Sequence, residues 1–158
     1  MGYEVIGMDV MPAAVDHGKN RGIDRIVLGD LAADWGLEPK SLRAVVLLDV
    51  LEHIADPVAV LRSAKRCLSE DGALIFTVPA YQWLMGKWDQ RLGHFRRYSR
   101  RMLVEQAAQA ELKVVRLSHW NAFTLPPAVV LRTLDRALKR DPRAEFPRLS
   151  NWLNSTLL

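Results

Sequence analysis

Cysteine and long apolar runs are the two features that this sequence most clearly lacks. The only cysteine is Cys67, so an internal disulfide is excluded and a reducing compartment is expected. No apolar run approaches the roughly 18 residues that a membrane-spanning helix needs. The first six residues carry no basic side chain, and residue 6 is isoleucine rather than serine or threonine. We therefore expect neither a signal peptide nor a myristoylation site, and a cytoplasmic location.

Charge is distributed unevenly along the chain. The 158 residues carry a net charge of +4. Residues 1–80 have 8 Lys or Arg against 12 Asp or Glu, whereas residues 81–158 have 14 against 6. A half with a net charge of +8 indicates an anionic partner, or else a solvated face with spare positive charge. Both interpretations stay open.

Residues 1–80 alternate between short apolar runs and helical patterns. Such alternation predicts βαβ units and therefore an α/β fold with a mostly parallel, doubly wound sheet. One helix is expected over residues 12–20, and Asp56 and Pro57 are the N-cap and first residue of another. The expected strands are Tyr3–Met8, Arg25–Leu28, Arg43–Leu48 and Ala73–Val78.

Residues 81–158 are less regular. They begin in an aromatic, basic loop that extends to residue 98, after which Ser99 is expected to cap a helix ending near Ala110. Lys113–His119 alternates as a strand does, and a helix is expected to start at Pro126. The last residues, Phe146–Leu158, are amphipathic and predict a further helix.

Acidic residues follow three of the expected strands. Ligands of parallel α/β sheets bind outside the carboxyl ends of the strands, where Asp9, Asp30 and Asp49 are expected. A carboxylate in the position of Asp9 accepts hydrogen bonds from a ribose diol in dinucleotide-binding folds. Asp30 could accept one from an adenine amino group. The alternative for Asp9 is a helix N-cap, and the alternative for Asp30 is a cap or a turn.

Three segments carry a resemblance to a known family. Leu48–Ile54 (LDVLEHI) is similar to the motif after the fourth strand of class I S-adenosylmethionine-dependent methyltransferases. Ser69–Phe76 (SEDGALIF) resembles the loop, glycine and fifth strand of that family, and Trp88–Ser99 (WDQRLGHFRRYS) resembles a segment of its bacterial type 11/12 members. The resemblance extends from about Tyr3 to Pro127.

The resemblance implies a Rossmann-like fold, S-adenosylmethionine as the cofactor and one domain over residues 1–158. Residues 1–80 would form its cofactor side, and residues 81–158 would form a substrate-side lid and helices. The ribose would lie at Asp9 and Val10, and the adenine at Asp30 and Leu31. The methionine part would pass Asp49 and Val50.

The family's first strand and its glycine-rich loop have no counterpart here. None of the nine glycines forms a Gly-x-Gly pair, although close approach of the backbone to the cofactor requires residues without a Cβ. Glu111 stands where a helix-ending glycine is usual, and the final antiparallel strand is missing too. We therefore expect a domain truncated at both ends, and a homodimer if copies exchange strands.

The basic loop holds the expected substrate residues. His94 could take a proton from the acceptor, and Arg96 and Arg97 could clamp an anionic acceptor. Tyr98 and Trp83 would complete the pocket. The alternative is that the arginines hold the loop itself in place.

A divalent-metal cluster of Asp49, Glu52 and His53 is a further hypothesis. Some small-RNA and ubiquinone-pathway methyltransferases resemble this stretch and use such residues for a cation. The alternative is that Glu52 and His53 only position the loop. We therefore expect no metal in this domain.

The leading function is methyl transfer to a small-molecule or lipid-linked acceptor. The positive charge of residues 81–158 suggests that this acceptor is anionic. A binding or scaffold domain without cofactor is the first alternative. Methylation of a nucleic acid ranks last, because no known RNA-binding module is present.

Overall fold

The computed structural model describes residues 3–120, 125–126, 129–130 and 133. The order of its elements confirms the expected alternation of strands and helices over the first half of the chain. The elements are β1 (Ile6–Asp9), α1 (Pro12–Asn20), β2 (Arg25–Leu28), β3 (Leu42–Leu48), the 3-10 helix η1 (Leu51–His53), α2 (Pro57–Cys67), β4 (Leu68–Thr77), the 3-10 helix η2 (Gln82–Leu84), α3 (Lys87–Arg91) and α4 (Arg100–Gln109).

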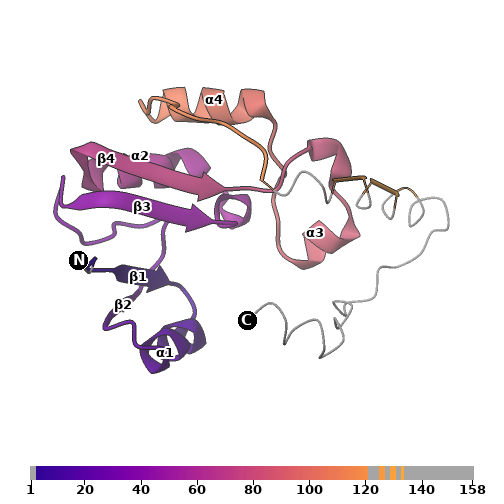
Figure 1. Cartoon of the computed structure of the whole chain (residues 1–158). Helices are drawn as coiled ribbons and strands as arrows, with labels where there is room; N and C mark the ends of the chain where they lie inside the picture. Colours follow the sequence, from indigo (N-terminus) through magenta and orange to yellow (C-terminus); the bar gives the residue numbers. More distant parts are fainter. Residues whose placement is uncertain (1–2, 121–124, 127–128, 131–132, 134–158) are drawn as a thin grey trace.

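The parallel sheet is divided into two pairs of strands. β1 pairs with β2, from Ile6 opposite Arg25 to Asp9 opposite Leu28. β3 pairs with β4, and Figure 1 shows these two long arrows side by side, pointing the same way. Within the described part of the chain no strand joins β1 to β3, so each pair keeps an unpaired edge. This break lies where the family's first strand was expected to be missing.

The core lies between the β3–β4 pair and the helices on one of its faces. Along β3, Val45 and Leu47 are buried whereas Val46 and Leu48 are exposed, as expected for a sheet covered on one side only. Met8 of β1 also packs against this core, which connects the two strand pairs. The buried cluster comprises Trp35, Val45, Leu47, Leu51, Val60, Leu61, Ala64, Cys67, Leu68, Tyr98 and Ala110.

Local signals set the ends of the two longer helices. The Asp56 carboxylate accepts hydrogen bonds from the backbone N–H groups of Val58 and Ala59, which confirms it as the N-cap of α2. The Ser99 hydroxyl accepts one from Met102 and caps α4. After α4 the backbone of Glu111 has a φ of 54°, the left-handed conformation that usually selects glycine at this position.

Three expectations about strands need correction. The strand expected over Ala73–Val78 is β4, which begins earlier and spans Leu68–Thr77. Tyr3–Met8 was expected to be a strand, but the strand is Ile6–Asp9. The prediction of a strand at Lys113–His119 is wrong, because these residues form no regular element and Val115 is 90% exposed. A strand needs a neighbour to pair with, and an alternating sequence does not provide one.

Part of the expected carboxyl-terminal structure can be compared with the model. Leu125 and Pro126 are helical, as expected for a helix that starts near Pro126. The rest of that helix and the helix expected over 146–158 fall largely or wholly outside the described residues. Among the residues that are described, no helix is long and apolar enough to cross a membrane.

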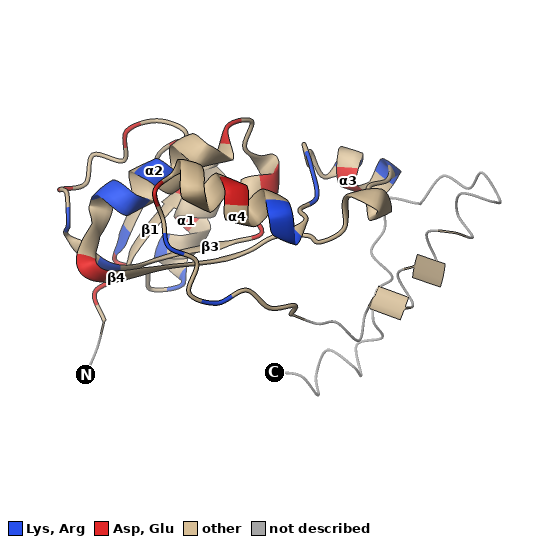
Figure 2. Ribbon diagram, turned by 90° about the horizontal axis from the view of Figure 1, so that it is seen from above, with Lys and Arg blue, Asp and Glu red and all other residues tan. Residues whose placement is uncertain are grey.

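Basic and acidic side chains are interspersed over the described surface. Figure 2 shows both signs of charge along α3 and α4, whereas the charged side chains of α2 are all basic. Several are paired across elements, including Lys65 of α2 with Glu111 and Arg66 of α2 with Asp34. These pairs neutralise part of the positive charge of α2.

Candidate functional site

Asp9 and Asp30 have the same local geometry at the ends of β1 and β2. One oxygen of Asp9 accepts a hydrogen bond of 2.8 Å from the backbone N–H of Met11. One oxygen of Asp30 accepts a bond of 2.8 Å from the N–H of Ala32. The N-cap residue of α1 is Met11, so Asp9 forms a turn and not the helix cap that was the alternative. The second oxygen of each carboxylate has no hydrogen-bond partner among the described residues and is available to accept from a ligand.

Asp49 follows β3 in a strained backbone conformation. Its φ is 52°, in the left-handed region that aspartate tolerates better than most residues do. Its N–H donates to the backbone carbonyl of Thr77 at 3.1 Å, and the Thr77 hydroxyl donates to the Asp49 carboxylate at 3.2 Å. These bonds join the carboxyl ends of β3 and β4. Val50 follows, half-buried against the core.

The loop of residues 93–98 is bound to the segment directly after Asp49. The Phe95 N–H donates to the carbonyl of Glu52 at 2.8 Å, and the buried Tyr98 hydroxyl donates to the carbonyl of Leu51 at 2.9 Å. Arg96 donates to the carbonyl of Ala55 at 2.9 Å. The loop is thereby fixed at the same end of β3 as the carboxylate of Asp49.

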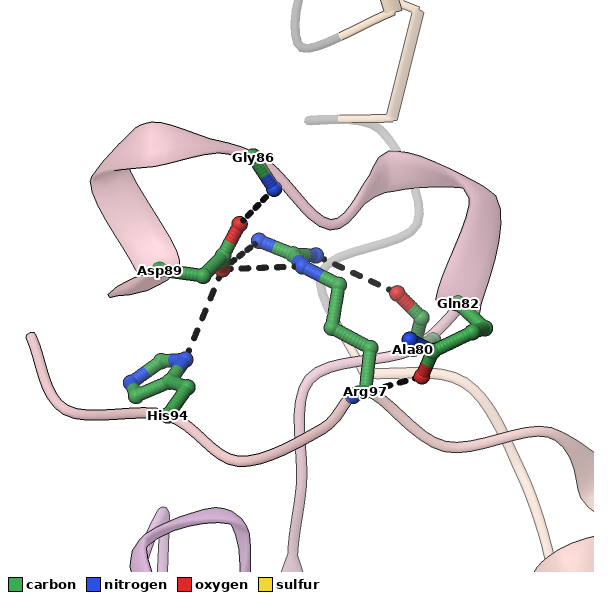
Figure 3. A network of polar contacts seen from close by, with 6 residues as sticks. All are labelled: Ala80, Gln82, Gly86, Asp89, His94 and Arg97. Atoms are coloured by element: carbon green, nitrogen blue, oxygen red, sulfur yellow. Dashed lines mark hydrogen bonds and ion pairs between the residues drawn. The ribbon is translucent and has the colours of Figure 1, made fainter. Parts of the chain in front are cut away.

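Asp89 is the centre of a polar network within residues 80–98, a segment that we call the lid. Figure 3 shows this network. The Asp89 side chain is 1% exposed, and one of its oxygens accepts from Nε and Nη2 of Arg97 at 2.9 and 2.6 Å. Its other oxygen accepts from the N–H of Gly86 at 2.8 Å. Arg97 also donates to the carbonyl of Ala80. His94 approaches the same carboxylate, with Nδ1 3.4 Å from the oxygen that Arg97 contacts.

Glu52, His53 and His94 form a compact group beside this network. One ligand-type atom of each lies within 4.8 Å of the others, so the group could hold a metal ion. The two imidazole rings meet edge to face, with centroids 4.6 Å apart. The cluster expected from the sequence contained Asp49, whereas the structure groups Glu52 and His53 with His94. Metal binding itself remains a hypothesis.

Burial perturbs the protonation of two members of this group. Burial raises the pKa of Glu52 to about 7; Asp49 adds to this effect, and a backbone hydrogen bond and Arg97 oppose it. The second oxygen of the Glu52 carboxylate has no hydrogen-bond partner in the described structure. Burial also lowers the pKa of His94, with His53 and Arg97 acting in the same direction and Asp89 in the opposite one.

The residues expected to contact substrate divide into two kinds. Tyr98 is 2% exposed and Arg97 is engaged with Asp89, so both have internal partners that hold the lid. Trp83 is 55% exposed and packs at a tilt against Tyr81, with ring centroids 5.8 Å apart. Substrate contact stays a prediction for all four residues, Arg96 included. Sequence reasoning missed Asp89, because no local pattern marks its burial or its pairing with a residue eight positions later.

Comparison with known proteins identifies the family. A family model described as a methyltransferase domain matches residues 1–117, about three quarters of the chain. The chain belongs to this methyltransferase family. Curated ubiquinone biosynthesis O-methyltransferases from strains of Xanthomonas oryzae pv. oryzae are 29% identical to this methyltransferase domain over 85 residues. That match covers 49% of the chain and 34% of the relative, so it spans only about a third of the length of the curated protein.

Solved structures show the same fold at low sequence identity. An S-adenosylmethionine-dependent methyltransferase from Thermotoga maritima superposes on this methyltransferase domain with a TM-score of 0.56 and 20% identity, over 66% of the chain and 53% of the other protein. The trans-methyltransferase CalH, solved with S-adenosylhomocysteine, gives a TM-score of 0.51 and 21% identity over 65% of the chain and 34% of CalH. These similarities confirm the class I methyltransferase fold for the region that matches.

Proposed function

We propose that this domain takes part in methyl transfer from S-adenosylmethionine to a hydroxyl group of a small-molecule or lipid-linked acceptor. The observation that carries the proposal is the repeated placement of a carboxylate at the carboxyl end of a parallel strand. Asp9 and Asp30 each offer an oxygen that has no hydrogen-bond partner among the described residues, and Asp49 closes the end of β3 beside the lid. The curated O-methyltransferase match supports an oxygen acceptor.

We call the carboxyl ends of β1 and β2, with Asp9 and Asp30, the rim. The rim would hold the adenosine end of the cofactor. Asp9, with Val10 beside it, would accept hydrogen bonds from the ribose diol. Asp30 would accept one from the adenine amino group, and the backbone N–H of Leu31 would donate to the ring. Asp49 and Val50 would border the methionine part.

The methionine end has less support within the described residues. Anions bind well where glycine-rich loops and helix N-termini present free N–H groups. This sequence has no Gly-x-Gly, and no described strand lies between β1 and β3. We therefore expect the adenosine end to be held more firmly than the methionine end.

The chemistry divides between the cofactor and the lid. When bound, S-adenosylmethionine supplies a methyl group made electrophilic by the sulfonium. The protein's part is to hold the acceptor oxygen in line with that group, which supplies much of the acceleration in such displacements. His94, 11% exposed in its side chain, would accept the proton that the hydroxyl loses. Trp83 would border the acceptor on the exposed side.

The break between β1 and β3 favours one alternative, a binding or scaffold domain that takes no cofactor. The two functions separate in a chain that is fused, before residue 1, to a strand, a Gly-x-Gly loop and a helix from a homologous domain. We call this form the extended chain. Methyl transfer requires that it bind S-adenosylmethionine, and a scaffold function does not.

Substitution of Asp9 tests the assignment in the extended chain. Asp9→Ala should weaken binding of S-adenosylmethionine by about 1–3 kcal/mol in titration calorimetry, because a hydrogen-bond partner of the ribose is lost. Asp16→Ala, an exposed carboxylate on α1, is the control and should change nothing. Equal affinities of the Asp9 variant and the unmodified extended chain would show that Asp9 serves only the local turn with Met11.

A further inference from the structure

We propose that Asp89 is a positioning residue for His94. It fixes the imidazole with Nδ1–H directed at the Asp89 carboxylate, and so leaves Nε2 as the nitrogen that takes the proton of the acceptor hydroxyl. The role of His94 in accepting the hydroxyl proton rests on the proposed function. The structural content of the proposal, a buried carboxylate that selects one tautomer of a histidine, stands on the contacts within the lid.

Groups other than the His94 side chain already hold the Asp89 carboxylate in place. Arg97 donates two hydrogen bonds to one oxygen and the Gly86 N–H donates one to the other. The backbone of His94 is tied to the same residue, because its N–H donates to the carbonyl of Asp89 at 2.9 Å. The carboxylate and the imidazole are therefore fixed relative to each other by both backbone and side-chain contacts.

The distance between the two side chains suits an orienting contact. Nδ1 of His94 lies 3.4 Å from the Asp89 oxygen, slightly longer than an ordinary N–H···O hydrogen bond. Nδ1 is buried and makes no hydrogen bond within the described residues, so the Asp89 oxygen is close to Nδ1 but not yet aligned with it. Catalytic hydrogen bonds are often long in the absence of ligand and shorten when substrate binds.

Only one neutral tautomer is compatible with this neighbour. Nδ1–H donates toward the carboxylate, whereas an unprotonated Nδ1 would direct a lone pair at a negative oxygen. A hydrogen bond at one ring nitrogen determines the state of the other, so Nε2 becomes the basic nitrogen. The groups that face His94 are Asp89, Arg97, His53 and Glu52. Of these, the Asp89 carboxylate is the one placed at Nδ1.

The consequence for methyl transfer can be written with every atom balanced. The acceptor oxygen forms a bond to the methyl carbon while the bond from that carbon to sulfur breaks. The electron pair of the broken bond stays on sulfur and neutralises the sulfonium. The hydroxyl proton moves to Nε2 of His94, and the imidazolium later releases it to water. Asp89 stabilises that imidazolium without taking the proton itself, as a buried carboxylate does beside a catalytic histidine.

Long-range proton–nitrogen NMR correlation on protein labelled with ¹⁵N-histidine reads the tautomer directly. The full 158-residue chain, treated with EDTA and without cofactor, is measured at a pH where His94 is neutral. The expected spectrum has a protonated Nδ1 and an unprotonated Nε2 at His94, assigned by its loss in His94→Gln. A protonated Nε2 in the unmodified chain would overturn the proposal, and this result needs no variant at Asp89.

Asp89→Ala supplies the second arm. It removes the oxygen that faces Nδ1, so we expect the Nδ1–H form of His94 to fall from dominant to a minority. Asp34→Ala removes a carboxylate from an exposed pair with Arg66 and should leave the His94 signals unchanged. An unchanged tautomer in folded Asp89→Ala would contradict the proposal. None of these spectra involves cofactor, so failure of S-adenosylmethionine binding would reject the proposed function without altering this result.

Discussion

The buried carboxylate of Asp89 accepts two hydrogen bonds from the guanidinium of Arg97, at 2.6 and 2.9 Å. Both side chains belong to the lid, and the same arginine reaches the carbonyl of Ala80. The neighbouring Arg96 makes different contacts: it donates to the exposed carbonyl of Ala55, and its guanidinium carbon lies 5.7 Å from the centroid of the Phe95 ring. Two consecutive arginines in the sequence thus have unequal structural importance.

Removal of the two arginines one at a time should reveal this difference. Arg97→Ala leaves the buried Asp89 charge without its partner, so we expect a loss of about 3–5 kcal/mol in the free energy of unfolding. Arg96→Ala removes a hydrogen bond to an exposed carbonyl and a cation–π contact with Phe95, and should cost about 1–2 kcal/mol. Urea denaturation followed by circular dichroism measures both. Equal losses in the two variants would show that the Asp89 pair is not what holds the lid.

Glu52 predicts a fall in stability as pH rises. Its folded-state pKa of about 7 lies above the ordinary value of 4.5, so the folded protein holds this proton more tightly than the unfolded chain does. Its contribution to stability is therefore full below about pH 4.5 and is lost as pH rises through about 7. Glu52→Gln should remove this dependence.

The measurement is the free energy of unfolding of both proteins at pH 5 and pH 8. Relative to the unmodified chain, the variant should gain roughly 2–3 kcal/mol between the two values. His17→Gln, at an exposed position on α1, serves as a control for the effect of substitution as such. Parallel pH profiles for Glu52→Gln and the unmodified chain would mean that this carboxyl group titrates normally.

Glu111 offers a simple gain in stability. Its left-handed backbone costs a residue with a Cβ about 1–2 kcal/mol, and its ion pair with Lys65 is solvent-exposed. Glu111→Gly should raise the melting temperature and the free energy of unfolding by about 0.5–1 kcal/mol. Glu111→Gln removes the ion pair but keeps the strained conformation, and should change stability little. A lower melting temperature for the glycine variant would show that the ion pair matters more than the strain.

Local sequence signals predicted the features that depend on residues close to one another in the chain, such as helix caps and strand ends. Asp56 and Ser99 cap their helices because their side chains reach N–H groups two or three residues away. The resemblance to the family, and not a local signal, placed Glu111 where a helix-ending glycine is usual, and its positive φ agrees with that position. The carboxylates at Asp9 and Asp49 follow strands as expected, since strand ends are marked by the end of apolar runs.

Features that depend on distant partners could not be predicted in this way. Lys113–His119 alternates like a strand, but strand formation requires a neighbouring strand that the pattern itself does not supply. The pairing of Asp89 with Arg97, and the approach of His94 to His53, depend on how the lid folds back on the residues after β3. Polar side chains in a basic loop give no sign of such burial.

The central claim is that Asp9 and Asp30 hold the adenosine end of the cofactor. Binding also needs the glycine loop that the extended chain adds before residue 1, together with a strand in the gap between β1 and β3. Titration calorimetry with S-adenosylmethionine on the 158-residue chain and on the extended chain tests both parts together. We expect a Kd above roughly 1 mM for the first and at least about tenfold tighter binding for the second, a gain of ~1.4 kcal/mol. Micromolar binding by the 158-residue chain itself would contradict the account.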